Sequence, residues 1–185
     1  MQKLFKTTTL QDAFGCNFNI LIAGMPRVMG VREILQEWTA WRTECVRRRL
    51  YFQMNKKKDK LHLLKGLGKI LLDIDKAIRI IRETELDAEV VPNLMIGFGI
   101  DQIQAEYVAE IKLRNINKEF ILNRLKETES LEKEIAELEA TLGSEKKVQA
   151  LICKELEQVA QKYGKERKTT LIYDHELQQE PDDEP

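Results

Sequence analysis

The sequence predicts a mainly α protein in which a long antiparallel coiled-coil arm carries a small helical domain at its tip and a short β-hairpin at its base. Apolar residues recur with heptad spacing in two segments, near 31–62 and 118–142, and these segments flank a compact apolar stretch. Charged residues make up 33% of the 185 residues and aromatic ones only 6%, a composition that suits long amphipathic helices better than a thick globular core.

Residues 1–30 form the predicted base of the arm. Apolar and polar residues alternate well enough over 16–23 to indicate a strand. Gly24–Arg27 supplies turn residues, and a second short strand is expected at Val28–Met29. Together these signals predict a small β-hairpin just before the first long helix.

Residues 31–62 are predicted to be the outgoing helix of the arm. Gly30 can cap this helix, with Glu33 in its first turn, and no proline follows until Pro92. A helix of about 30 residues is about 45 Å long. Steps of four and three between apolar positions predict a coiled-coil seam at Ile34, Trp38, Trp41, Cys45, Arg48 and Phe52.

Residues 63–117 are predicted to form the compact helical domain at the tip. The apolar stripe widens here, which indicates packing against more than one helix. Gly66 and Gly68 each cost roughly 0.5–1 kcal/mol in a helix interior, so the pair indicates a bend or a tight helix contact. Pro92 and the turn at Gly97–Gly99 are expected to interrupt the helical pattern.

Two further helices have recognisable capping residues. Asp101 and Gln104 have capping-box spacing, which predicts a short helix to about Arg114. Asn117 is expected to cap the returning helix, 118–163. Heptad spacing predicts the seam of this helix at Ile121, Arg124, Thr128, Leu131, Ile135, Leu138 and Leu142.

The returning helix is expected to change register once before it ends. Gly143–Ser144 breaks the apolar period, and Gly164 suits a C-cap. Residues 164–185 are predicted to contain a return strand, in the strand-like Thr169–Tyr173, followed by a disordered acidic tail that has nothing to bury.

Opposite charges are expected to face each other along the arm. The chain runs out along one helix and back along the other, so the pair should be antiparallel. Each exposed ion pair contributes only about 0.2–1 kcal/mol, so these charges select orientation and register more than they stabilise. The expected partners are Arg47, Arg48, Arg49, Lys56, Lys57, Lys58 and Lys60 on the outgoing helix and Glu127, Glu129, Glu132, Glu134, Glu137 and Glu139 on the returning one.

No group of residues indicates a catalytic, cofactor-binding or metal site. Cys16, Cys45 and Cys153 are far apart and lack CxxC spacing, which argues against disulfides and zinc. His62 and His175 have no second ligand at metal-binding spacing. No apolar run approaches the roughly 18–20 residues needed to cross a bilayer, and the start lacks a secretion signal, so a cytoplasmic protein is expected.

The basic cluster of the outgoing helix allows two interpretations. A solvated or ion-paired helix face is favoured, because no base-stacking aromatic platform or known reading motif accompanies the cluster. Contact with a DNA backbone is the alternative, since clustered cations favour phosphate. The candidate residues for DNA contact are Arg47, Arg48, Arg49, Lys56, Lys57 and Lys58.

Several stretches of the chain match, in order, parts of one known family. The first group of stretches is 9–18, 31–35 and 47–49, and the second is 60–67 and 74–82. The third runs from 97–106 through 112–114, and the fourth is 163–170. These stretches resemble the coiled-coil entrance, the far-end helix, the gate segment and the return strand of the A subunits of bacterial type IIA DNA topoisomerases, DNA gyrase and topoisomerase IV. The chain is identified as a member of this family, in its coiled-coil and exit-gate part.

The resemblance implies a homodimeric enzyme that cuts one DNA duplex, passes another through the break and releases it by an exit gate. The family's cleaving tyrosine lies in a winged-helix region upstream of the matched stretches, so no catalytic residue is expected here. ATP and Mg²⁺ act through other regions, and the ATPase is on a separate B subunit. The tip would then be the dimerisation domain, with interface residues Leu67, Leu71, Ile74, Ile103, Tyr107, Val108 and Ile111.

Two other functions stay open on the sequence. One is a self-contained coiled-coil scaffold or adaptor without a DNA role, against which the hairpin at 16–29 argues. The other is a standalone nucleic-acid binder that uses the 47–60 cluster. Within the family, departures from the usual pattern at Glu83–Met95 and Leu113–Asn117 leave gyrase and topoisomerase IV both open.

Overall fold

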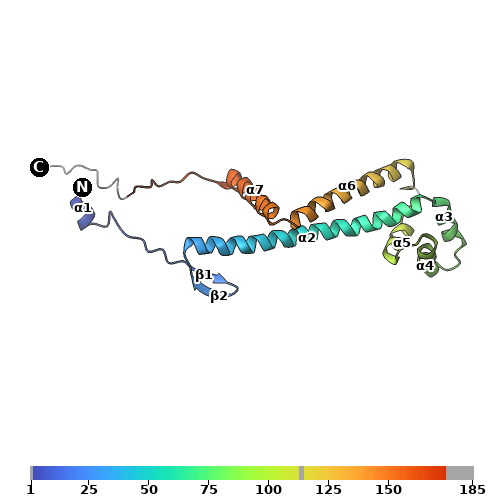
Figure 1. Cartoon of the computed structure of the whole chain (residues 1–185), viewed down its shortest axis with the longest axis horizontal. Helices are drawn as coiled ribbons and strands as arrows, with labels where there is room; N and C mark the ends of the chain where they lie inside the picture. Colours follow the sequence, from blue (N-terminus) through green and yellow to red (C-terminus); the bar gives the residue numbers. More distant parts are fainter. Residues whose placement is uncertain (1, 113–114, 174–185) are drawn as a thin grey trace.

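The computed structural model describes residues 2–112 and 115–173, and it confirms a mainly α fold. The elements are α1 (Gln2–Thr7), β1 (Asn19–Ile22), β2 (Met25–Val28), α2 (Val31–Leu71), α3 (Ile74–Glu83), α4 (Asp87–Phe98), α5 (Gln102–Ala109), α6 (Lys118–Leu142) and α7 (Glu145–Tyr163). One long helix, α2, has a group of short helices at one end and a two-stranded hairpin at its other end, and α1 and the chain after α7 extend beyond the hairpin (Figure 1).

The arm is α2 with the returning helices α6 and α7. The head is α3, α4 and α5 together with α2 from Leu61 onward. The base is the hairpin with the N-terminal half of α2, and the returning chain ends near the base end of the molecule (Figure 1). The acidic tail and His175 lie outside the described residues.

Helix α2 is a single rod of 41 residues, about 60 Å long at 1.5 Å per residue. It begins where expected, because the N–H of the N-cap Gly30 donates to the Glu33 carboxylate at 3.1 Å. It also continues through Gly66 and Gly68 to Leu71 without interruption. The glycine pair therefore marks a tight helix contact and no helix break, since Gly66 is buried against α5.

The seam predicted for α2 was wrong over its middle. The side chains that meet the returning helices are Val46, Leu50 and Met54, which are 1%, 5% and 7% exposed. The predicted positions Trp41 and Phe52 are 56% and 69% exposed, on the opposite side of the helix. Val46, Leu50 and Met54 recur every four residues, so α2 has a second apolar stripe, and the packing of α6 and α7 decides which stripe is buried.

The returning helices follow the prediction more closely. The Asn117 side chain accepts the Phe120 N–H at 2.8 Å and caps α6. Leu131 and Ile135 are each 7% exposed, and the other predicted seam positions are partly buried. Gly143–Ser144 separates α6 from α7 as expected.

The β-hairpin is present, with a shorter first strand and an earlier turn than predicted. Ala23 and Gly24 form a two-residue turn in which both φ angles are positive, at 51° and 80°. Pro26, placed in the turn by the prediction, lies in β2 opposite Leu21. A two-stranded sheet consists of edge strands, where a proline without an N–H is tolerated.

Three details of the head and the chain end also differ from the prediction. Pro92 lies inside α4, as its sixth residue, where the helix continues although proline cannot donate to the Ala88 carbonyl. The next helix, α5, ends at Ala109, before the predicted Arg114. Thr169–Tyr173 is not a strand, since no described strand pairs with it.

The largest apolar core lies in the head. It joins the distal end of α2 to α3, α4, α5 and α6, and Leu94 and Ala105 at its centre are fully buried. A smaller cluster lies where α7 crosses α2, around Val46, Val148 and Ile152. The head is therefore a separately packed unit at the far end of a thin arm.

Candidate functional site

The residues predicted to form a dimer contact are divided between the core and the surface of the head. Leu67 and Val108 are 2% and 8% exposed and belong to the core of the head. Ile103, on the first turn of α5, is 64% exposed. The remaining predicted residues are partly buried, namely Leu71, Ile74, Tyr107 and Ile111.

An apolar groove of about 230 Å³ opens on the head between the end of α2, α3 and α5. Leu71, Ile74 and Ile111 line it together with Ile78 and Ile81 of α3. The groove therefore brings together five of the seven predicted residues, because Leu67 and Val108 also line it. A partner surface placed here would cover apolar side chains that the protomer leaves partly exposed.

The predicted contact residues do not include the two most exposed apolar side chains described in the head. Leu72 is 88% exposed at the end of α2, and Ile96 is 84% exposed on α4. Ile96 was overlooked because Pro92 was taken to break the helix that presents it. A helix predicted over 87–98 would have placed Ile96 on the face opposite the buried Leu94.

The start of α5 is attached to α2 by a small polar network. The Asp101 carboxylate accepts the Gln104 N–H at 2.9 Å, and its other oxygen meets His62 Nε2. The hydrogen bond from the Gln104 backbone N–H lowers the pKa of Asp101, and His62 lowers it further. The predicted capping box at Asp101 and Gln104 is confirmed.

Two lysines satisfy the carbonyls at the end of α4. Lys69 Nζ donates to the Gly99 carbonyl at 2.8 Å, and Lys76 Nζ donates to the Gly97 carbonyl at 2.6 Å. Cations are favourable at a helix C-terminus, where carbonyls lack helical partners. These contacts fix α4 to both α2 and α3.

Ion pairs connect the outgoing and returning helices, as predicted for Lys57, Lys58 and Lys60. Lys60 pairs with Glu127, Lys57 with Glu134, and Lys58 with Glu139 at 2.6 Å. The Lys60 hydrogen bond lowers the pKa of Glu127, and the Lys57 hydrogen bond lowers the pKa of Glu134. The antiparallel register therefore neutralises much of the basic face.

The arginines behave differently from the lysines. Arg49 pairs with Glu155 on α7, an acid that was not among the expected partners, and Arg42 joins the same carboxylate at 2.9 Å. Arg48 forms its ion pair within its own helix, with Glu44 at 3.9 Å. Within the described ranges, Arg47 and Lys56 have no ion pair. Of the six candidate DNA contacts, Arg49, Lys57 and Lys58 are thus paired across the arm.

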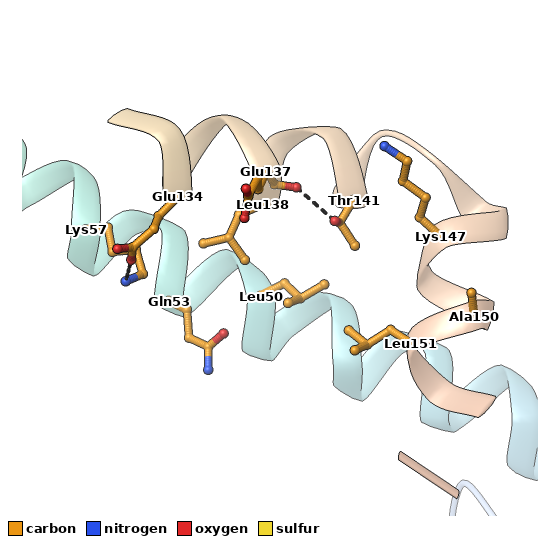
Figure 2. Close-up of a pocket in the computed structure, with 10 residues that line it drawn as sticks. All are labelled: Leu50, Gln53, Lys57, Glu134, Glu137, Leu138, Thr141, Lys147, Ala150 and Leu151. Atoms are coloured by element: carbon orange, nitrogen blue, oxygen red, sulfur yellow. Dashed lines mark hydrogen bonds and ion pairs between the residues drawn. The ribbon is translucent and has the colours of Figure 1, made fainter. Parts of the chain in front are cut away.

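The returning side of the arm has a joint at Gly143–Ser144. A pocket of about 480 Å³ lies beneath this joint, between α6, α7 and α2. Figure 2 shows Leu50, Leu138 and Leu151 as its apolar part, with the Lys57–Glu134 ion pair at one end. Because α2 is continuous opposite the joint, the arm is one rod braced by two shorter helices.

Two kinds of functional feature are absent from residues 2–112 and 115–173. These residues contain no cluster of three or more His, Cys, Asp or Glu side chains arranged to hold a metal ion. None of their helices combines the length and the apolar character needed to cross a bilayer.

Comparison with known proteins identifies the family. The family model for the A subunit of DNA gyrase/topoisomerase IV matches residues 1–157. The A subunit of DNA topoisomerase 4 from Salmonella typhimurium is 41% identical over 172 residues, which is 92% of this chain and 22% of that protein. The A subunit of DNA gyrase from Clostridium acetobutylicum is 38% identical over 175 residues, which is 92% of this chain and 21% of that protein. The chain spans about a fifth of the length of these relatives, and it belongs to the family of DNA gyrase/topoisomerase IV A subunits.

Proposed function

We propose that this chain is the arm and exit gate of a type IIA DNA topoisomerase A subunit. The observation that carries the proposal is the separately packed head, which leaves large apolar side chains uncovered at the far end of the arm. Leu72, Ile96 and Ile103 are 88%, 84% and 64% exposed there. Large apolar side chains exposed in one region can mark a protein contact, and a second copy of the head is the proposed partner.

In the proposed mechanism the chain acts mechanically. Two arms per dimer enclose a cavity for the transported duplex, and the two heads close it by meeting across a two-fold axis. Separating apolar surfaces costs about 25 cal/mol per Å², so a contact made by a few exposed residues can reopen. The joint between α6 and α7 allows the returning side of the arm to adjust while α2 stays rigid.

The proposal assigns the remaining chemistry to other parts of the enzyme. DNA cleavage, ATP and Mg²⁺ would act through regions outside these 185 residues, with the ATPase on a B subunit in the cytoplasm. The family relationship supports this division over a self-contained scaffold without a DNA role. The partners of the whole enzyme would be a second copy of the A subunit, double-stranded DNA and the B subunit.

Analytical ultracentrifugation of the 185-residue chain tests the gate. We expect a dimer at micromolar concentration that Ile103→Glu converts to monomer. Gln102→Glu is the matched control, because it adds the same charge at the neighbouring exposed position without removing an apolar side chain. A wild-type monomer would remove the gate proposal, and a dimer insensitive to Ile103→Glu would remove Ile103 from the contact.

We also propose that the arm alone binds DNA weakly. Three of its candidate cations are held by Glu134, Glu139 and Glu155, so few positive charges are free to meet phosphates. A duplex titration at low salt should show low affinity with a shallow salt dependence, since each released counterion steepens that dependence. High affinity that Arg47→Ala and Lys56→Ala abolish would instead support a nucleic-acid-binding arm.

A further inference from the structure

Helix α5, which presents Ile103, is attached to α2 by one buried polar side chain. Gln104 is 7% exposed and lies beside an otherwise apolar core. Its Nε2 donates to the His62 carbonyl at 2.7 Å, and its Oε1 accepts the Asp101 N–H at 3.3 Å. Leaving a buried amide unpaired is costly, so these bonds favour one placement of α5 against α2.

Gly66 forms the notch in α2 that receives Gln104. A Cβ at position 66 would lie 2.6 Å from Gln104 Cβ and 2.7 Å from Gln104 Cγ. Because Cβ cannot move by side-chain rotation, any larger residue at 66 would push α5 itself away. Gly68 lies two residues further along the same helix and has nothing within 4 Å of its Cβ position.

A second contact closes the same junction from outside. His62, one turn before Gly66, meets the Asp101 carboxylate, and Asp101 caps α5. The side chain of His62 is 51% exposed and that of Asp101 is 46% exposed, so this pair is at the surface, whereas Gln104 is buried beneath it. The start of α5 is thus attached to α2 by a contact at the surface and by a buried contact beneath it.

We infer that the Gln104–Gly66 lock is a positioning device that makes the gate helix move with the arm helix as one body. This inference rests on the proposed gate function, which it deepens. Ile103 precedes Gln104 on the same turn of α5, so the orientation of the exposed Ile103 side chain is set by how Gln104 is seated. Rotation or tilt of α2 then reaches the gate surface directly.

The first experiment compares Gly66→Ala with Gly68→Ala in the whole chain. Spin labels at Asp59→Cys and Glu106→Cys report the distance between α2 and α5, after Cys16, Cys45 and Cys153 are replaced by serine or alanine. Labelled protein is diluted into unlabelled protein, so that only distances within one protomer are read. We expect Gly66→Ala to shift or broaden the distance distribution and Gly68→Ala to leave it unchanged.

The same two variants are expected to differ in how strongly they dimerise. Gly66→Ala should weaken the dimer by about tenfold, because overpacking displaces α5. Gly68→Ala should change the dimer dissociation constant by no more than about twofold. Circular dichroism of both variants checks that the helices are retained.

The second experiment uses a pH profile that a purely structural role would not produce. Gln104→Glu keeps the size of the side chain but places a carboxylate against the His62 carbonyl. The neighbouring titratable groups are His62 and Asp101, so each value is taken relative to wild type at the same pH. The carboxyl introduced at position 104 should protonate by about pH 5, since burial raises its pKa above the usual ~4.3.

At about pH 8 we expect Gln104→Glu to raise the dimer dissociation constant by about tenfold relative to wild type. At about pH 5 we expect the dissociation constant of this variant to lie within about threefold of the wild-type value. Gln104→Leu should be weak at both pH values, because it has no hydrogen to donate. Identical distance distributions for Gly66→Ala and Gly68→Ala would overturn the lock. A wild-type monomer would overturn the gate, while the spin-label distances still decide the lock.

Discussion

The head of this molecule has a buried apolar core, whereas the described residues of the base include no buried apolar side chain before Val46. In the head, Leu94 and Ala105 are fully buried, and five helices contribute to one core. At the base, Leu35, Trp41 and the hairpin residue Leu21 are 58%, 56% and 70% exposed. Both regions contain comparable apolar side chains, so the difference arises from how many elements surround them.

This contrast indicates which region of the molecule buries its apolar side chains within the chain. The head buries its core with its own helices and with Leu131 of the adjoining α6. The base has one long helix and a two-stranded hairpin, and two strands alone cannot cover the aromatic face beside them. Large exposed apolar surfaces mark interaction sites, so we expect the base to depend on contacts outside these residues.

The largest test of the contrast is truncation in the head core. Leu94→Ala should lower the free energy of unfolding by about 2–5 kcal/mol, because it opens a cavity at a side chain that is 0% exposed. Leu35→Ala at the base should change it by no more than about 0.5 kcal/mol. Urea denaturation followed by circular dichroism measures both. Similar losses for the two variants would show that the base is packed as tightly as the head.

The next test concerns the two faces of α2. Met54→Ala should cost about 2–3 kcal/mol, since Met54 is 7% exposed under the returning helices. Phe52→Ala should cost less than about 0.5 kcal/mol, because Phe52 is 69% exposed. Thermal unfolding of the two variants compares the faces directly. A greater loss for Phe52→Ala would restore the seam that the sequence predicted.

A smaller effect is expected from the ion pairs that brace the arm. A double-mutant cycle on Lys60 and Glu127 should give a coupling of about 0.2–1 kcal/mol, because both side chains are partly exposed. The coupling should shrink in high salt, which screens exposed charges. A coupling that salt does not change would mean that packing, and not charge, connects these positions.

The smallest expected effect is the pH dependence of stability near pH 4. The pKa values of Asp101, Glu127 and Glu134 are lowered from their ordinary values of 3.8, 4.5 and 4.5. A carboxyl group whose pKa is lower in the folded chain than in the unfolded chain stabilises the fold at pH values above its pKa in the unfolded chain. That stabilisation is lost as the pH falls through its pKa in the folded chain. Acid titration of Glu127→Gln should show a flatter loss of stability below about pH 4.5 than wild type. An unchanged acid profile would exclude Glu127 as a contributor.

Local signals in the sequence were sufficient to predict where three of the helices begin. Gly30, Asp101 and Asn117 all cap helices at the predicted positions, because capping depends on groups within four residues. The seam of α6 was also predictable, since only one of its faces has apolar heptad spacing. The buried lock at Gln104 was not, because the Gly66 pair signalled a close contact without saying what approaches it.

The errors in the prediction have a common cause. Trp38, Trp41 and Phe52 were assigned to a coiled-coil seam because their spacing is right, but they share α2 with a second apolar face. Pro92 was predicted to interrupt the helical pattern, but α4 continues through it from Asp87 to Phe98. In both cases a local pattern was compatible with two structures, and packing of distant elements selected one.

Residue spacing and near neighbours in the chain were enough to establish the helical class, the antiparallel course of the arm, most of the helix caps and the family resemblance. Long-range packing was needed to establish which face of α2 is buried, which cations remain unpaired and how α5 is locked to α2. Those outcomes depend on side chains 40 or more positions apart, such as His62 and Gln104, whose meeting no local pattern encodes.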